Sequence, residues 1–89
     1  MSVYRFPPIT CRPKTFADQI NKIYEEVQEV IDAYAHAESY KAVGIELMDV
    51  IQSCETALRM LPFTDNGTEM LRAETIEKNA KRGYYEVSK

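Results

Sequence analysis

Two short acidic motifs occur on separate stretches of the 89-residue chain, "EEVQE" at residues 25–29 and "ELMD" at residues 46–49. Each motif contains two acids at positions i and i+3, Glu26 with Glu29 and Glu46 with Asp49. On a helical wheel, at about 100° per residue, the two pairs lie on the same flank of the apolar stripe of their helix. If the two helices pack antiparallel, the four carboxylates converge at the edge of the interface.

Four carboxylates in one place repel one another at neutral pH unless a cation neutralises them. Because every ligand atom would be an oxygen, Mg²⁺ is favoured over zinc or copper, with Mn²⁺ as its substitute. Mg²⁺ usually contacts phosphates as well, which predicts a phosphorylated substrate and attack of an activated water on phosphorus. The alternative interpretation is that the acids only solvate the outer faces of two helices.

The motifs lie on two predicted helices. Residues 1–14 contain three of the four prolines and no apolar periodicity, so they are predicted to form an irregular N-terminal arm. Thr15 offers an N-cap, and the helix that follows it fades around residues 35–38. Ser39 offers the N-cap of the second helix. That helix ends before Pro62, because the residue before a proline disfavours the α region.

Each of these helices carries an apolar stripe at helical spacing. The stripes consist of Ile20, Ile23, Val27, Val30, Ile31 and Tyr34 on the first helix, and of Val43, Leu47, Val50, Ile51, Cys54, Leu58 and Leu61 on the second. The sequence therefore predicts an all-α fold, a small antiparallel helical hairpin followed by a C-terminal helix. Because so short a chain has a modest core, we expect the chain to complete that core by oligomerising.

The stretch "PFTDNGT" is predicted to be the turn before the third helix, with Asn66-Gly67 as its strongest signal. Thr68 is then the N-cap of that helix. The helix runs to Lys81 or Arg82, and Gly83 follows at the position where glycine commonly ends a helix.

Three polar side chains near the end of the third helix could bind a polyphosphate. Lys78, Asn79 and Arg82 offer the cationic and amide donors that non-bridging phosphate oxygens accept. Cations close to a helix C-terminus also interact favourably with the helix dipole, and that explanation alone is adequate.

The composition argues against several classes of function. Eleven basic and 14 acidic residues give a net charge of −3, with no basic face for DNA or RNA, so no nucleic acid polymer is expected as a partner. No apolar run reaches the length of about 18 residues that predicts a membrane span, and the N-terminus lacks the apolar core of a secretory signal. Cys11 and Cys54 show no C-x-x-C spacing, so we expect two reduced thiols in a cytoplasmic protein.

The two acidic motifs, sixteen residues apart, resemble the E-E-x-x-E…E-x-x-D signature of the MazG-like nucleotide pyrophosphohydrolases, within the all-α NTP pyrophosphatase superfamily. "EKNAKRGYY" at residues 77–85 is similar to the closing motif of that family. The resemblance covers roughly residues 15–85. It implies an N-terminal arm at 1–14 and one MazG-like helical domain at 15–89.

The resemblance implies a Mg²⁺-dependent hydrolase that cleaves a nucleoside triphosphate between its α and β phosphates. The products are the monophosphate and pyrophosphate, and the role is nucleotide-pool house-cleaning. The metal ligands carried over are Glu26, Glu29, Glu46 and Asp49. The catalytic acids carried over are Glu25, Glu26 and Glu29, of which Glu25 orients water. The phosphate contacts carried over are Lys78, Asn79 and Arg82. Members of the family are typically dimers or tetramers in which two chains share a bundle, so the resemblance implies a homodimer or homotetramer that completes a four-helix-type bundle.

The N-terminal arm departs from the family, whose members carry a further helix before the first acidic motif. That helix helps to form the nucleotide pocket, whereas the prolines of "YRFPPITCRPK" oppose a helix here. Base recognition would then rest on the arm, on Gln19 or Lys22, or on a partner chain. Lys22 lies one turn before Glu26, so it could contact substrate or only pair with that acid.

Two alternatives stay open. Phosphoribosyl-ATP pyrophosphohydrolase is similar in size and motif, but it has a Gly before its paired acids and a Tyr-His pair after its E-x-x-D. This sequence has Tyr24 and "VIQS" at those places, so the MazG-like interpretation ranks first. The other alternative is a non-catalytic helical module for dimerisation or adaptor binding, in which the acids serve solubility.

Overall fold

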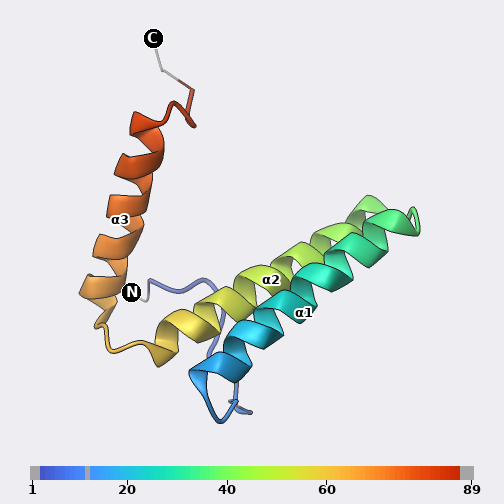
Figure 1. Ribbon diagram of the computed structural model, residues 1–89, viewed down its shortest axis with the longest axis horizontal. Helices are drawn as coiled ribbons and strands as arrows, with labels where there is room; N and C mark the ends of the chain where they lie inside the picture. The colour runs from blue at the N-terminus through green and yellow to red at the C-terminus, as the bar shows by residue number, and fades with distance from the viewer. Residues whose placement is uncertain (1–2, 12, 87–89) are drawn as a thin grey trace. The chain divides into compact units, whose positions relative to one another are not determined.

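Three α-helices make up the regular structure of the described residues. In the computed structural model (Figure 1), which describes residues 3–11 and 13–86, they are α1 (Phe16–Ala35), α2 (Tyr40–Met60) and α3 (Asp65–Lys81). The described residues contain no strand, which confirms the predicted all-α class. They divide into two compact units, one of residues 4–61 and one of Val3 with residues 62–86. None of the described helices combines the length and the apolar character that a membrane span needs.

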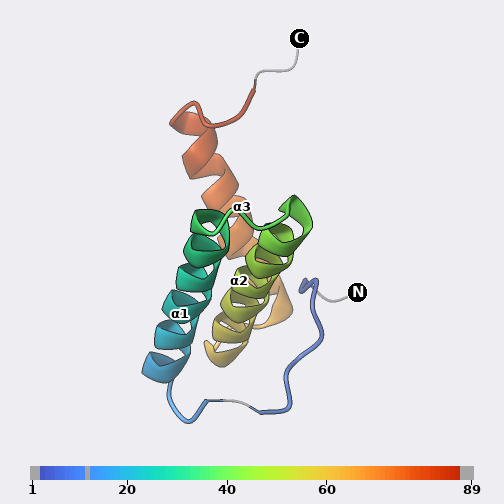
Figure 2. The same cartoon turned by 90° about the vertical axis from the view of Figure 1, so that its right-hand side faces the viewer.

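Helices α1 and α2 form an antiparallel hairpin. Figures 1 and 2 show them side by side and running in opposite directions. Thr15 Oγ1 accepts a hydrogen bond from the N–H of Asp18 (3.1 Å), and Ser39 Oγ accepts one from the N–H of Ala42 (3.1 Å). Both N-caps were predicted. Each satisfies a backbone N–H that its helix leaves without an intrahelical partner.

A residue in the left-handed conformation closes the turn between α1 and α2. Ala37 has a φ of 54°. Its N–H donates to the carbonyl of Tyr34 (3.1 Å), and the N–H of Glu38 donates to the carbonyl of Ala33 (3.1 Å). These two bonds make a Schellman motif, which usually has glycine at this position. Because the left-handed region costs an L-residue roughly 1–2 kcal/mol, Ala37 is strained.

Helix α3 begins earlier than the sequence predicted. Its N-cap is Thr64, whose Oγ1 accepts a hydrogen bond from the N–H of Gly67 (3.1 Å). The predicted N-cap Thr68 is instead a buried residue inside the helix, and the Asn66-Gly67 pair lies in its first turn. Both threonines meet the composition rule for an N-cap, but Asp65 places a favourable negative charge in the first turn that follows Thr64.

The other helix ends agree with the prediction. Leu61, just before Pro62, is extended with a ψ of 154°, so α2 ends at Met60. After α3, Gly83 has a φ of 78°, and the N–H of Tyr84 donates to the carbonyl of Asn79 (3.0 Å). This is a second Schellman motif, here with the glycine that the motif favours.

Most of the buried residues of α1 and α2 are polar. The buried residues of α1 are Gln19, Glu26 and Ala33, at a spacing of seven that places them in one row along the helix. The side-chain N–H of Gln19 donates to the carbonyl of Ser53 across the interface (2.8 Å). The acids were expected at the edge of the contact between the helices, but Glu26 lies in the row that faces α2.

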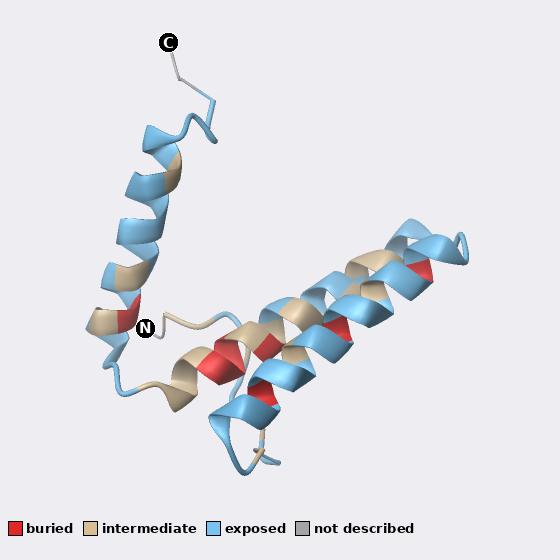
Figure 3. Cartoon of the chain, viewed as in Figure 1, coloured by how far each residue is buried: buried red, intermediate tan, exposed pale blue. Residues whose placement is uncertain are grey.

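The predicted apolar stripes are only partly covered, since their residues range from half-buried to exposed. Val27 and Ile31 are 39% and 52% exposed, and Leu47 and Ile51 of α2 are exposed as well. Figure 3 shows α1 as mostly exposed, with separate buried patches along it. Among the described apolar residues only Ala33 and Ala57 are buried. The hairpin therefore packs along a row beside the stripes, and much of both stripes stays uncovered by the described part of the chain.

We expect Ala37→Gly to stabilise the chain by about 0.5–1 kcal/mol, because glycine adopts the left-handed conformation without the strain that alanine bears. The midpoint of thermal unfolding should rise by about 2–6 °C. Ala35→Gly, inside α1, is the matched control and should lower the midpoint. A lower midpoint for Ala37→Gly would contradict the assignment of strain to this turn.

Candidate metal centre

Three acids from the two helices of the hairpin meet in one place. Glu26 of α1 and Glu46 and Asp49 of α2 each offer a carboxylate oxygen, and these oxygens lie within 4.8 Å of one another. The buried row of α1 directs Glu26 towards α2, and the i, i+3 spacing places Glu46 and Asp49 on one side of α2. The fold of a single chain thus brings together three of the four acids that were predicted to bind metal.

Glu26 is the most enclosed member of this cluster, with 8% of its surface exposed. Its Oε1 lies 3.0 Å from the ammonium nitrogen of Lys22. Its Oε2 is buried and has no hydrogen-bond partner among the described residues. A buried carboxylate oxygen without a partner raises the free energy of the folded state. This atom therefore marks a place where a cation would be stabilised.

The three acids suit Mg²⁺ in chemistry and in spacing. Bonds of about 2.0–2.1 Å place two oxygens on one Mg²⁺ at most about 4.2 Å apart. Oxygens that already lie within 4.8 Å of one another need only small side-chain shifts to reach that spacing. No histidine or cysteine of the described chain belongs to the cluster, which disfavours zinc and copper.

Glu29, the fourth predicted ligand, is exposed and lies outside the cluster of three. When protonated, Glu29 can donate a hydrogen bond to the carboxylate of Glu26, and this raises the pKa of Glu29; the negative charges of Glu26 and, more weakly, Glu46 raise it further. Glu29 is thus close enough to interact with the cluster electrostatically.

Lys22 supplies a positive charge at the edge of the cluster. The hydrogen bond to Glu26 and the charge of that carboxylate raise the pKa of the Lys22 ammonium group. Its side chain is 54% exposed, whereas that of Glu26 is enclosed. The Lys22 ammonium group can therefore move from Glu26 to another anion with little loss of packing. The structure is compatible with both roles predicted for Lys22, pairing with Glu26 and contact with substrate.

A small hollow of about 160 Å³ opens beside the cluster. The cluster members in its lining are Glu26 and Asp49, and the other lining residues are Ile9, Gln19, Lys22, Gln52, Ser53 and Thr56. Ile9, Ser53 and Thr56 were not predicted, because they belong to no motif. The available signal was the seven-residue spacing of Gln19 and Glu26, which indicates a polar row suited to face a second helix.

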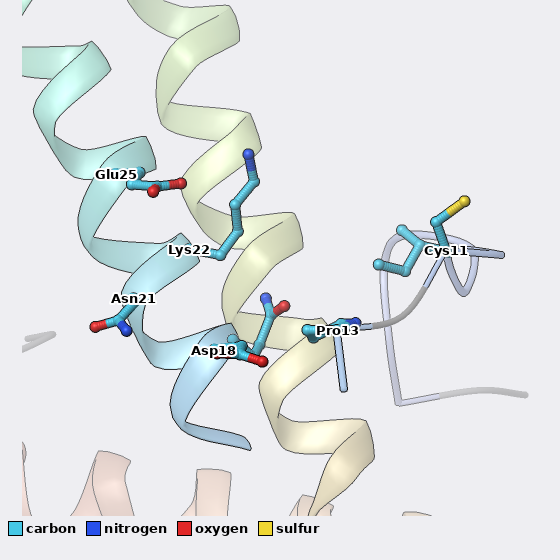
Figure 4. Close-up of a pocket in the computed structure, with 8 residues that line it drawn as sticks. Cys11, Pro13, Asp18, Asn21, Lys22 and Glu25 are labelled. Carbon is cyan, nitrogen blue, oxygen red and sulfur yellow. The ribbon is translucent and has the colours of Figure 1, made fainter. Parts of the chain in front are cut away.

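Glu25 lies apart from the cluster, as its sequence position suggested. It lines a second and larger hollow, of about 460 Å³, between α1 and the N-terminal arm. Figure 4 shows Glu25 and Lys22 extending from α1, with Cys11 and Pro13 on the arm beyond them. Glu25 is thus adjacent in sequence to a cluster acid while its side chain stays outside the group of three oxygens.

The three predicted phosphate contacts lie at the C-terminal end of α3. Lys78 and Asn79 are near the end of the helix, and Arg82 is its C-cap. Lys78 and Arg82 are exposed, and Asn79 is half-buried. All three belong to the second compact unit, so their approach to the acids stays a prediction.

Without metal, we expect protonation of Glu29 to increase the free energy of unfolding as the pH falls from about 7 towards about 5. Because its pKa is raised in the folded chain, the folded state binds this proton more readily than the unfolded state does, and protonation favours folding. Glu29→Gln should be at least as stable as the parent at neutral pH and should lose this component of the pH dependence.

Urea unfolding at both pH values, in the presence of a chelator, measures this effect. Glu74→Gln, which removes an exposed acid of α3, is the control and should follow the parent. Identical pH dependence in the parent and in Glu29→Gln would show that Glu29 does not sense the cluster.

The chain was compared with known proteins at three levels. Protein-family models, curated proteins and solved structures yielded no match to it.

Proposed function

We propose that the chain is a Mg²⁺-dependent nucleoside triphosphate pyrophosphohydrolase, which converts a (d)NTP and water into the (d)NMP and pyrophosphate. The observation that carries this proposal is the buried, unpartnered Oε2 of Glu26 in a cluster with Glu46 and Asp49. A divalent cation would give that oxygen a partner and would offset the repulsion among the three acids. The resemblance of the two acidic motifs to MazG-like enzymes supports the same function from the sequence.

The chain's own residues divide the work of the proposed reaction. Glu26, Glu46 and Asp49 would hold Mg²⁺, which when bound supplies charge stabilisation at the phosphate oxygens. Glu29 lies one turn from Glu26 and would complete the ligand set. Glu25 lies outside the cluster, so its carboxylate would stay available to accept a hydrogen bond from the attacking water and to orient it.

The cationic side chains would bind the polyphosphate. Lys22 neutralises Glu26 in the absence of metal. Once the cation takes over that role, the half-exposed Lys22 side chain would turn to a phosphate oxygen. Lys78, Asn79 and Arg82 at the end of α3 would bind further phosphate oxygens, as the closing motif of the family implies.

A second copy of the chain would cover the exposed stripes. Two buried alanines are a small apolar core for a chain of this size. Large apolar side chains at helical spacing on both helices remain exposed, and large exposed apolar patches are typical of interfaces between protein chains. The exposed stripe residues lie on both helices of the hairpin, so two copies related by a two-fold axis would pack them together as a four-helix-type bundle.

We expect Asp49→Asn to remove stabilisation by Mg²⁺ or Mn²⁺ and to lower the rate of pyrophosphate release by at least about 100-fold. In the parent chain, millimolar metal should raise the midpoint of thermal unfolding by mass action. A pyrophosphate assay over canonical and modified (d)NTPs gives the rate. A parent chain that metal does not stabilise and that releases no pyrophosphate would favour the non-catalytic helical module.

Arg82→Ala provides the contrasting variant. It should keep the metal-dependent rise in the unfolding midpoint, because Arg82 is not a metal ligand, while its KM for the nucleotide increases. If metal binding and nucleotide binding weaken equally in this variant, Arg82 has a structural role at the end of α3.

We also expect Ile31→Lys to dissociate the oligomer, because it places a charge in the centre of the proposed interface. Gln28→Lys, which puts the same charge on a nearby exposed position of α1, is the matched control and should leave association unchanged. Sedimentation over a range of chain concentrations measures the difference. If the parent is already monomeric, or if Ile31→Lys associates as the parent does, the stripes have another occupant.

A further inference from the structure

Two side chains of α2 fix the N-terminal arm. The carboxylate of Glu55, which is buried, accepts hydrogen bonds from the N–H groups of Arg5 (3.0 and 3.1 Å) and Phe6 (2.9 Å). Arg59, one turn later, donates to the carbonyl of Phe6 (2.8 Å), and its guanidinium lies 4.1 Å from the centre of the Tyr4 ring. Hydrogen bonds to charged groups are among the stronger ones in proteins, so the arm is anchored where it passes α2.

From this anchor the arm continues to the start of α1 (Figure 2) and forms one wall of the larger hollow. The arm contributes Ile9, Cys11 and Pro13, and α1 contributes polar side chains, among them Lys22 and Glu25. Figure 4 shows Cys11 and Pro13 across from the α1 side chains. The volume of about 460 Å³ falls in the range of small-molecule sites.

The larger hollow adjoins the smaller one beside the metal cluster. Ile9, Gln19 and Lys22 line both of them. Lys22 marks the boundary, because its ammonium group contacts Glu26 while its side chain also borders the space next to the arm. A ligand with an anionic end and a larger, partly apolar end could therefore occupy both hollows at once.

We infer that the hollow between the arm and α1 receives the nucleobase of the nucleotide whose phosphates bind at the acidic cluster. This inference rests on the proposed function and adds where the base binds and which segment recognises it. Ile9 and Pro13 offer an apolar surface against which a flat heterocycle can pack, and the side-chain amides of Gln19 and Asn21 can bind its polar edges. The arm thus takes the role that a preceding helix has in the resembled family.

The test compares nucleotides with a base-free polyphosphate. The probes are the α,β-methylene analogues of the four canonical dNTPs and inorganic tripolyphosphate, each titrated into the chain with Mg²⁺ by calorimetry. Ile9→Ala should weaken binding of the tightest nucleotide analogue by about 10-fold and weaken tripolyphosphate binding far less, because Ile9 lines both hollows but offers a phosphate no polar group. Thr10→Ala, at an exposed arm position outside the lining of both hollows, is the matched control and should change neither.

A second measurement uses the cysteines of the unmodified chain. Both thiols are free, as expected from the sequence; Cys11 is exposed on the arm, while burial raises the pKa of Cys54. Iodoacetamide should therefore modify Cys11 first, because the thiolate is the reactive form. Peptide mapping should show that the nucleotide analogue protects Cys11 at least about 5-fold more than tripolyphosphate at equal occupancy.

The outcomes separate the two proposals. If neither nucleotide nor tripolyphosphate binds the parent chain with Mg²⁺, the proposed function fails and the base pocket with it. If both bind but Ile9→Ala weakens them equally, or weakens neither, the base lies elsewhere while the proposed function stands. Equal protection of Cys11 by both probes would place phosphate rather than base in the hollow and would also overturn the inference.

Discussion

The buried carboxylate of Glu26 constrains the whole hairpin. In most helical hairpins the row between the helices is apolar, and burying a charge there is costly unless the charge is fully paired. Lys22 pairs one oxygen of Glu26 and leaves the other without a partner. Two further acids on α2 border the same space. On the proposed function, metal binding and the stability of the hairpin are therefore coupled, since the cation removes a cost that the metal-free fold carries.

The polar row and the apolar stripe of α1 are neighbouring rows of the same helix. Gln19 and Glu26 lie in one row, and the next residues along the chain, Ile20 and Val27, lie in the other. One row faces α2 and builds the candidate metal centre, while the other is largely exposed and suits association with a second chain. Each face can change without altering the other, because side chains one position apart point about 100° away from each other.

Much of the fold could be predicted, because helix ends depend on local chemistry. Thr15, Ser39, Pro62 and Gly83 each act within a few residues of their own position, and the structure agrees at all four. Thr64 and Thr68 are both suited to cap a helix, so composition did not distinguish them. Three of the four acids predicted from spacing lie together, whereas Glu29 lies outside their cluster. Which row of α1 would be buried could not be predicted, since apolar periodicity shows which face avoids water but not which surface covers it.

The path of the arm was also beyond prediction, for a physical reason. Its proline content indicated that it is not helical, but its position depends on Glu55 and Arg59, some fifty residues away in the chain. In these contacts the arm contributes backbone N–H and carbonyl groups. Every residue type has a backbone, so the order of residue types in the arm does not indicate where these hydrogen bonds form. The hollow beside α1 exists because of them. The hollow between the arm and α1 is thus the part of the candidate site that could least be predicted from the sequence.

The anchor that Glu55 and Arg59 make for the arm has one more consequence. It binds the N–H groups of residues 5 and 6 and one carbonyl, groups that nearly every amino acid shares. These hydrogen bonds do not involve the side chains of Arg5 and Phe6. The residues further along the arm, which form the wall of the larger hollow, take no part in them. Evolution could therefore exchange Ile9, Cys11 or Pro13 and so retune ligand choice, while the anchor and the acids on the helices stay as they are.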